Sequence, residues 1–297
     1  MKTTNKFNLP QPVVQGLSQE HYTRGESDRS VTQLIGSPRQ QILSRQHFDE
    51  LEEDVTDRLW SVFGTAVHNI FESYGDAEHL AEERLFADVD GWRISGAIDV
   101  QKSNQDGTVE IVDYKVTSVW KIIYSVMKGV PDQHWQLQQN FYAWLVETVK
   151  GIKVDKLTII AILRDWKASD SERKGSDYPQ SPIMSIELPL WDFETRDNYV
   201  RDRVAFHQEA EFNHLTGQSL PLCDDEDRWL KPPQFAVKKP KNKRADRVFE
   251  NKADAEAYLV NKLGLVIEER KSEPIRCMRY CHAAPFCSQH REYLNGR

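Results

Sequence analysis

Two carboxylates and a lysine in the first half of the chain have the types and the spacing that metal-assisted hydrolysis uses. Asp113, Tyr114 and Lys115 follow a mostly apolar run, and Asp99 ends a Gly-Ala-Ile-Asp segment fourteen residues earlier. In a strand, Asp113 and Lys115 share one face because side chains alternate. Carboxylates at the ends of neighbouring strands bind hard cations such as Mg²⁺ or Mn²⁺. Such a metal turns bound water into hydroxide and polarises a phosphoryl oxygen, while a lysine offsets the developing charge.

An ordinary cross-strand salt bridge among these charged residues explains the same spacing. An acid-x-Lys triplet also occurs at residues 165–167, 172–174, 250–252 and 269–271. Two further features favour a functional site. His68 is expected one turn into a helix, with Glu72 on the same face. Gln138 and Tyr142 share an otherwise apolar helical face, where a buried glutamine needs hydrogen-bond partners.

The spacing of apolar residues predicts the elements that position these side chains. The turn signal Asp-Gly within residues 103–107 predicts a hairpin between two of the strands. Helices are expected from His47 to a break at Gly64, from Thr65 onward, and over 119–128, 132–150 and 191–215. Strands are expected over 84–89, 92–101, 108–116 and 156–163, with an exposed loop at 166–181 and an edge strand at 183–188.

The four cysteines are concentrated toward one end of the chain. Cys277, Cys281 and Cys287 lie within the last 21 residues, and Cys223 is the fourth. Thiolates clustered in this way favour Zn²⁺ or an iron–sulfur cluster over disulfides. The alternative is a set of unrelated buried thiols. His282 and His290 are further candidate ligands.

The charge distribution restricts the partners. The net charge of −7 argues against a general nucleic-acid binder, but residues 238–247 hold six Lys or Arg and one Asp. This tract is either a solvated loop or a surface that contacts a polyanion. If the tract contacts a polyanion, the expected DNA contacts come from Lys238, Lys239, Lys241, Lys243 and Arg244. No secretory signal and no membrane-spanning run is expected, and the chain is expected to be cytoplasmic.

The order of the motifs resembles the RecB-like branch of the PD-(D/E)XK nuclease superfamily over about residues 30–165. The motifs are Gly64-x3-His68, Gly96-x2-Asp99, Asp113-Tyr114-Lys115 and Gln138-x3-Tyr142. The resemblance implies an α/β fold with a mixed central β-sheet flanked by helices, a restriction-endonuclease-like core. It implies a metal bound by His68, Asp99, Asp113 and the Tyr114 carbonyl, and Lys115 as the catalytic lysine. Gln138 and Tyr142 would shape the active site and the DNA path. Asp113 stands where many relatives carry Glu.

Some nucleases of this branch, in CRISPR adaptation and break repair, hold a [4Fe–4S] cluster with one distant cysteine and three C-terminal ones. The resemblance implies such a cluster on Cys223, Cys277, Cys281 and Cys287, with structural Zn²⁺ as the alternative. This chain departs from the pattern twice. The last three cysteines are separated by three and five residues rather than two and five. Residues 37–39, Ser-Pro-Arg, stand where relatives carry the lone cysteine.

These features predict three regions: a polar N-terminal lead (1–29), a nuclease core (30–215) and a C-terminal basic and four-cysteine metal-binding region (216–297). The predicted function is a metal-dependent DNA nuclease, an exonuclease or end-processing enzyme in recombination, repair or phage DNA metabolism. The alternative is a catalytically inert DNA-binding or scaffold subunit. The chain also resembles standalone phage nucleases, which implies a bacterial cytoplasm. Single-stranded DNA or duplex ends are the expected substrates. Any ATP-driven unwinding would need a helicase or recombination partner, because no helicase motif is present.

Overall fold

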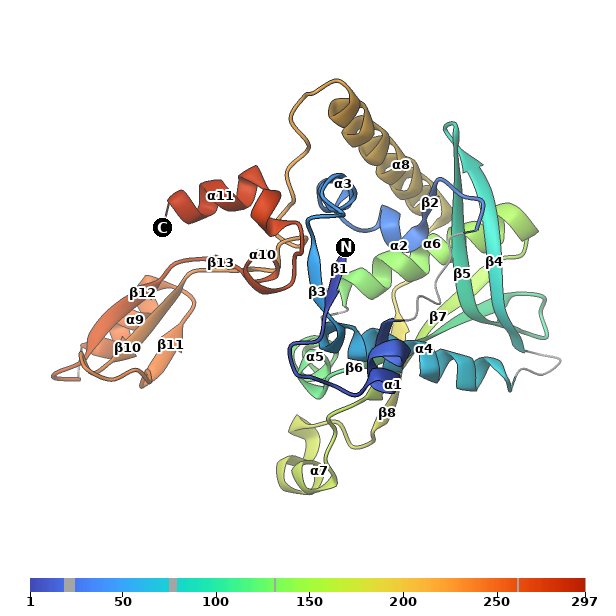
Figure 1. Ribbon diagram of the computed structural model, residues 1–297. Coiled ribbons are helices and arrows are strands. Elements are labelled where there is room, and N and C mark those ends of the chain that lie inside the picture. Colours follow the sequence, from blue (N-terminus) through green and yellow to red (C-terminus); the bar gives the residue numbers. More distant parts are fainter. Residues whose placement is uncertain (19–24, 75–78, 131, 261, 297) are drawn as a thin grey trace. The chain divides into compact units, whose positions relative to one another are not determined.

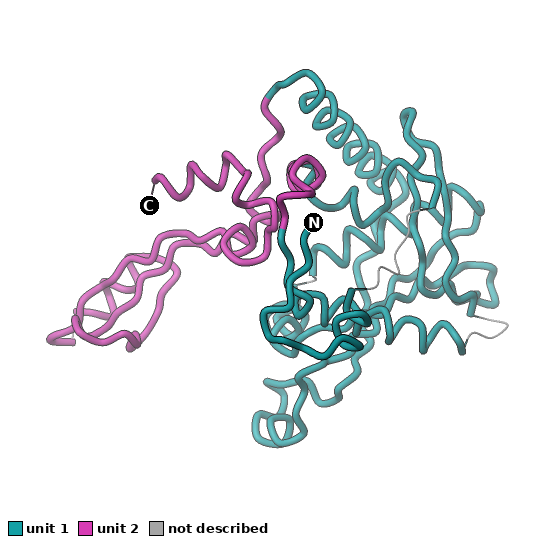
Figure 2. Tube along the Cα trace, in the orientation of Figure 1, with its two compact units in different colours: residues 1–38, 52–218 teal, residues 39–51, 219–297 magenta. Residues whose placement is uncertain are grey.

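A computed structural model of the chain describes residues 1–18, 25–74, 79–130, 132–260 and 262–296. The chain forms two compact units (Figure 2): unit 1 contains residues 1–38 and 52–218, and unit 2 contains residues 39–51 and 219–297. The boundary after residue 218 lies near the expected change of character at 216. No sequence feature indicated that residues 39–51 belong with the C-terminal part. Within the described ranges, no helix is long and apolar enough to span a bilayer.

Unit 1 is built on a six-stranded sheet with the order β2-β5-β6-β7-β8, in which β4 also pairs with β5 (Figure 1). The β5–β6 and β7–β8 pairs are antiparallel, and the β6–β7 and β2–β5 pairs are parallel, so the sheet is mixed. Its strands are β2 (Arg29–Ser30), β4 (His79–Val89), β5 (Trp92–Ser103), β6 (Val109–Thr117), β7 (Val154–Leu163) and β8 (Ile183–Leu188). The expected fold class, a mixed central sheet flanked by helices, is confirmed.

Helices pack on this sheet and connect its strands. They are α1 (Gln11–Ser18), α2 (Val31–Leu34), η1 (Val55–Arg58), α4 (Leu59–Glu72), α5 (Val119–Tyr124), η2 (Val126–Lys128), α6 (Gln133–Lys150), α7 (Ala168–Lys174), η3 (Gly175–Asp177) and α8 (Phe193–Leu215). The polar lead contains α1 and the strand β1 (Lys2–Thr4), which pairs with β3 (Glu52–Asp54). Residues 19–24 of the lead lie outside the described residues.

Two sequence predictions about these elements were wrong. Within the described range 25–74, no helix begins near His47. A different helix ends just before it, at Gln46, and β3 and η1 follow. Helix α4 then runs through Gly64, where a Cβ would meet no atom within 4 Å, so the glycine marks no break. The loop expected over 166–181 contains α7, whose Asp170 pairs with Arg173 and Lys174 at helical spacing.

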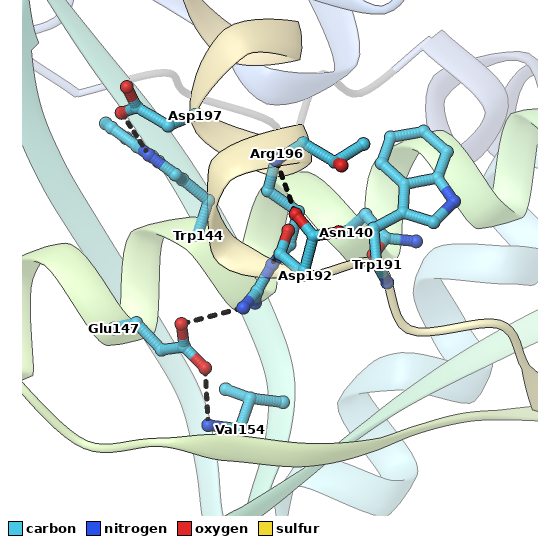
Figure 3. A network of polar contacts seen from close by, with 9 residues as sticks. Asn140, Trp144, Glu147, Val154, Trp191, Asp192, Arg196 and Asp197 are labelled. Atoms are coloured by element: carbon cyan, nitrogen blue, oxygen red, sulfur yellow. Dashed lines mark hydrogen bonds and ion pairs between the residues drawn. The ribbon is translucent and has the colours of Figure 1, made fainter.

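Helix α6 is the central helix of unit 1, and polar contacts fix it to α8 and the sheet (Figure 3). Arg196 donates to Glu147 at 2.7 Å, and Glu147 accepts from the backbone N–H of Val154 at 2.9 Å. Trp144 donates to Asp197 at 2.9 Å. These contacts join one face of α6 both to α8 and to the first residue of β7, and so hold the helix against the two elements.

Unit 2 contains a three-stranded antiparallel sheet, β11-β10-β12, and a separate small apolar cluster around Leu43, Ala283 and Cys287. Leu263 is fully exposed, because it lies in the turn after the helix over residues 252–259. The elements of unit 2 are α3 (Pro38–Gln46, from Arg39 on), β9 (Leu230–Lys231), β10 (Gln234–Lys238), β11 (Arg247–Phe249), α9 (Lys252–Leu259), β12 (Val266–Arg270), β13 (Glu273–Pro274), α10 (Ile275–Arg279), η4 (Ala284–Phe286) and α11 (Ser288–Asn295).

Candidate active site

A cleft of about 450 Å³ opens in unit 1 where strands β5 and β6 separate. Their ladder ends at the pair Val100 and Val112, and the next residue on each strand is Asp99 or Asp113. Strand β4 pairs along the whole of β5, so β2 and β6 share the other edge of β5. Residues 96–99 lie in the gap between these two partners. The two carboxylates therefore face each other inside the sheet, and not at the strand ends that the sequence suggested.

Asp113 and Lys115 form an ion pair on one face of β6. Lys115 Nζ lies 2.6 Å from Oδ2 of Asp113, whose side chain is only 2% exposed. Burial raises the pKa of Asp113 to about 6, while the charge of Lys115 opposes the rise. Oδ2 has no hydrogen bond of good geometry in the described part of the chain. This buried oxygen could therefore bind a second positively charged group besides Lys115.

Asp99 connects β5, β6 and α4. Its Oδ2 accepts a hydrogen bond from the backbone N–H of Tyr114 at 2.9 Å and lies 3.2 Å from Nδ1 of His68. Burial lowers the pKa of His68, but contact with Asp99 and the charge of Asp113 outweigh this, so the net shift is upward. The Tyr114 ring packs against His68 and Phe71, which holds α4 beside β6.

The predicted pair Gln138 and Tyr142 also lines the cleft, from α6. Both side chains are buried, and Gln138 donates to the Tyr142 hydroxyl at 2.9 Å. This close approach of α6 to β5 needs Gly96. A Cβ there would lie 2.7 Å from Leu145 and 2.9 Å from Tyr142. The glycine of the Gly-x2-Asp motif therefore makes room for the helix.

Two acidic residues of the cleft were not assigned from the sequence. Glu82 lies opposite Asp99 at a one-residue interruption of the β4–β5 ladder, with φ of 33°. The pKa of Glu82 is raised because its protonated carboxyl donates a hydrogen bond to Glu72, and burial and the charges of Glu72 and Asp99 act in the same direction. For Glu72, its position four residues after His68 was the one sequence feature that could have placed it in the cleft. The backbone distortion at Glu82 has no such signature in the sequence.

The donor set suits a hard divalent cation. Asp99, Asp113 and His68 supply carboxylate and imidazole donors in one cleft, where the buried Oδ2 of Asp113 already attracts the ammonium of Lys115. Across the described ranges, no three His, Cys, Asp or Glu side chains already surround one point closely enough to hold a metal. Binding would therefore require side-chain adjustment, including displacement of Lys115 from Asp113.

Three cysteines of unit 2 lie near one another. Cys277 and Cys281 line a pocket of about 380 Å³ together with His290, whose Nδ1 is buried without a hydrogen-bond partner in the described region. Burial raises the pKa of Cys277, and the charges of Cys281 and Cys287 raise it further. The backbone N–H and carbonyl of Cys223 are held by the side-chain amide of Gln289. None of the four described cysteines forms a disulfide.

Arg39 contacts the last cysteine. Its buried guanidinium donates from Nε to Sγ of Cys287 at 3.3 Å and from Nη2 to Ser288 at 2.6 Å. It also donates to the carbonyls of Leu220 and Pro221. The position at which the resemblance would place a cysteine is therefore taken by a guanidinium in contact with a cysteine.

The basic tract connects β10 to β11 in unit 2. Lys239, Lys241, Lys243 and Arg244 are exposed. Lys238 differs from them, because it is mostly buried and ion-paired with Glu268. The tract thus contains four exposed basic side chains, and a fifth that is ion-paired within unit 2.

No protein-family profile and no curated protein sequence matches this chain. Among solved structures, the chain is similar to the protein SSO0001, with 18% identity, 65% of this chain and 84% of that chain covered, and a TM-score of 0.43. It is also similar to an alkaline exonuclease, LHK-Exo, from Laribacter hongkongensis, alone and in complex with dAMP. Those matches have 13% identity, cover 63% of this chain and 91% of the exonuclease, and have a TM-score of 0.33.

Proposed function

We propose that unit 1 is a metal-dependent DNA nuclease that hydrolyses phosphodiester bonds at DNA ends. The observation that carries the proposal is the meeting of Asp99, Asp113, Lys115 and His68 in one cleft where β5 and β6 separate. These are the residue types that the resemblance to the RecB-like branch assigns to catalysis. An ordinary cross-strand salt bridge requires neither the cleft nor the histidine.

Each group has a distinct role in the proposed reaction. Bound Mg²⁺ or Mn²⁺ would supply Lewis-acid chemistry and lower the pKa of water. Asp99 and Asp113 would hold it, with His68 and the Tyr114 carbonyl as further ligands. The ammonium of Lys115, once released from Asp113, would orient the attacking water and offset the charge that develops on the phosphate. Gln138 and Tyr142 would position the DNA strand along α6.

We further propose that unit 2 holds a [4Fe–4S] cluster, or structural Zn²⁺ in its place, on Cys277, Cys281, Cys287 and Cys223. The support is the shared pocket of Cys277 and Cys281 and the mutual electrostatic influence of the three C-terminal thiols. Thiolates at such spacing suit soft or borderline metals. The exposed part of the basic tract would supply phosphate contacts to DNA.

The direct test of the nuclease proposal uses purified full-length protein. Single-stranded and blunt duplex DNA, labelled at the 5′ or the 3′ end, is incubated with Mg²⁺ or Mn²⁺, with or without EDTA. We expect cleavage that requires the metal and stops with EDTA. Products that shorten from one labelled end would identify an exonuclease. Absence of cleavage with either metal, together with retained DNA binding, would favour the inert DNA-binding alternative.

A further inference from the structure

Three large aromatic rings are exposed beside the cleft of unit 1. Trp60 is 51% exposed, Trp120 56% and Tyr124 62%. We call these three residues the aromatic platform. Helix α4, which carries Trp60, has no buried residue, and Trp120 stacks on Tyr124 with ring centroids 5.7 Å apart. Large rings gathered on a surface in this way mark a binding site for another molecule.

The platform begins at the cleft with Trp60 on α4 and continues with Trp120 and Tyr124 on α5. Trp60 lines the cleft, and the guanidinium of Arg164 lies over its ring at 4.3 Å. The backbone N–H of Arg164 donates to the carbonyl of Thr117 at the end of β6, and Asp165 accepts from the backbone N–H of Val119 at 2.7 Å. The neighbouring residue Trp120 is therefore held close to the residue that covers Trp60.

Each ring of the platform has a cation near its face. Besides Arg164 over Trp60, Lys128 lies 4.8 Å from the centroid of Tyr124, and Lys174 lies 5.8 Å from that of Trp120. In the part of the chain that the structure describes, neither Arg164 nor Lys128 is ion-paired with a carboxylate. These two charges are available to an anionic ligand that also presents flat apolar faces.

We propose that the aromatic platform binds the unpaired bases of single-stranded DNA and leads the strand into the cleft. Unpaired bases expose the flat faces that stack on aromatic rings, whereas duplex bases already stack on one another. Arg164 and Lys128 contact the phosphates between stacked bases. A protein partner fits less well, because lysine is depleted where protein interfaces are buried. The inference rests on the proposed nuclease function and adds the substrate class.

The test compares binding rather than cleavage, with EDTA present throughout. Fluorescence anisotropy measures the affinity of a labelled thymidine oligonucleotide and of a blunt duplex for the wild type and for the Trp120→Ala/Tyr124→Ala variant. Neither substituted residue lines the cleft. Phe212→Ala on α8 is the matched control, since Phe212 is 58% exposed and lies outside the platform. The Trp120→Tyr and Trp120→Leu variants separate ring stacking from apolar contact.

We expect the double variant to lose about tenfold or more in affinity for the oligonucleotide and to bind the duplex within twofold of wild type. Trp120→Tyr should retain affinity, Trp120→Leu should lose it, and Phe212→Ala should have no effect. Quenching of tryptophan fluorescence by the oligonucleotide should decrease in Trp120→Tyr. Unchanged affinity in the double variant, or equal loss for both DNA forms, would overturn the inference. Full affinity in Trp120→Leu would show that apolar contact rather than ring stacking holds the oligonucleotide, and would also overturn the inference. If the platform binds single strands as expected but the wild type cleaves no DNA, the nuclease proposal fails and the binding inference stands.

Discussion

The backbone N–H of Tyr114 donates to Oδ2 of Asp99 at 2.9 Å, just beyond Val100 and Val112, the last paired residues of β5 and β6. A carboxylate has thus replaced a backbone acceptor at the point where the ladder ends. This bond keeps the two strands in register as they separate. It also fixes Asp99 opposite Asp113 and turns the same carboxylate oxygen toward His68.

His207 should make stability depend on pH. It is 1% exposed, and its Nε2 lies 3.1 and 3.2 Å from the carbonyl oxygens of Leu34 and Gly36, so this nitrogen carries the proton in the neutral ring. Burial and the charge of Arg203 lower the pKa of His207 to about 4. The unfolded state, with an ordinary pKa, binds a proton first as pH falls. Stability is therefore greatest above the unfolded pKa and falls between pH 6.5 and 4 by up to about 3 kcal/mol.

Urea unfolding across this pH range checks the prediction with His207→Gln as the comparison. Glutamine can donate to the same carbonyls but does not titrate, so its profile should be flatter than that of wild type below pH 6.5. Parallel profiles for the two proteins would show that His207 does not cause the acid-side loss.

Gln139 should be a site where an apolar residue stabilises the protein. It is fully buried in α6, and neither amide atom has a hydrogen-bond partner in the described part of the chain. Methionine has a similar shape and no amide to desolvate. Gln139→Met should therefore raise the free energy of unfolding by about 1–2 kcal/mol. Gln138→Met is the matched comparison and should destabilise, because Gln138 donates to Tyr142. A destabilised Gln139→Met variant would contradict the prediction.

The sequence predicted some of the elements around the cleft and missed others. Strong local signals identified β5 and β6 and their connecting turn, and strand alternation correctly placed Asp113 and Lys115 on one face. The separation of β5 from β6 was not predictable, because β2, a strand of two residues, takes the vacated edge of β5. A two-residue strand has no periodicity to detect. The assignment of α3 to unit 2 depends on long-range contacts such as Arg39 with Cys287.

The basic tract should contribute to the salt dependence of DNA binding. Changing Lys239, Lys241, Lys243 and Arg244 to Ala should lower the slope of log K against log salt by up to about 0.9 per lost duplex phosphate contact. Lys238→Ala should change the slope less, because Lys238 is paired with Glu268. Binding titrations over a salt series measure the slope. A slope unchanged in the fourfold variant would assign the tract to a solvated loop.

The cysteine proposal predicts a metal in the purified protein. Protein prepared without oxygen should be brown with iron and sulfide if the site is [4Fe–4S], or colourless with about one Zn per chain if it is zinc. Cys281→Ser should remove the metal and make unit 2 more sensitive to protease. Ser288→Ala, a neighbouring change that spares the thiols, should retain the metal. Elemental analysis that finds neither metal, with four reactive thiols in native protein, would contradict the proposal.

The rate of DNA cleavage by Asp113→Asn, compared with wild type at saturating Mg²⁺, tests the central claim most directly. Asparagine preserves the size of the side chain but removes its charge, so folding should persist while metal binding fails. We predict a loss of about a thousandfold or more, with wild-type circular dichroism and retained binding of DNA in EDTA. A folded Asp113→Asn protein that cleaves DNA within twofold of the wild-type rate would contradict the assignment of this cleft as the active site.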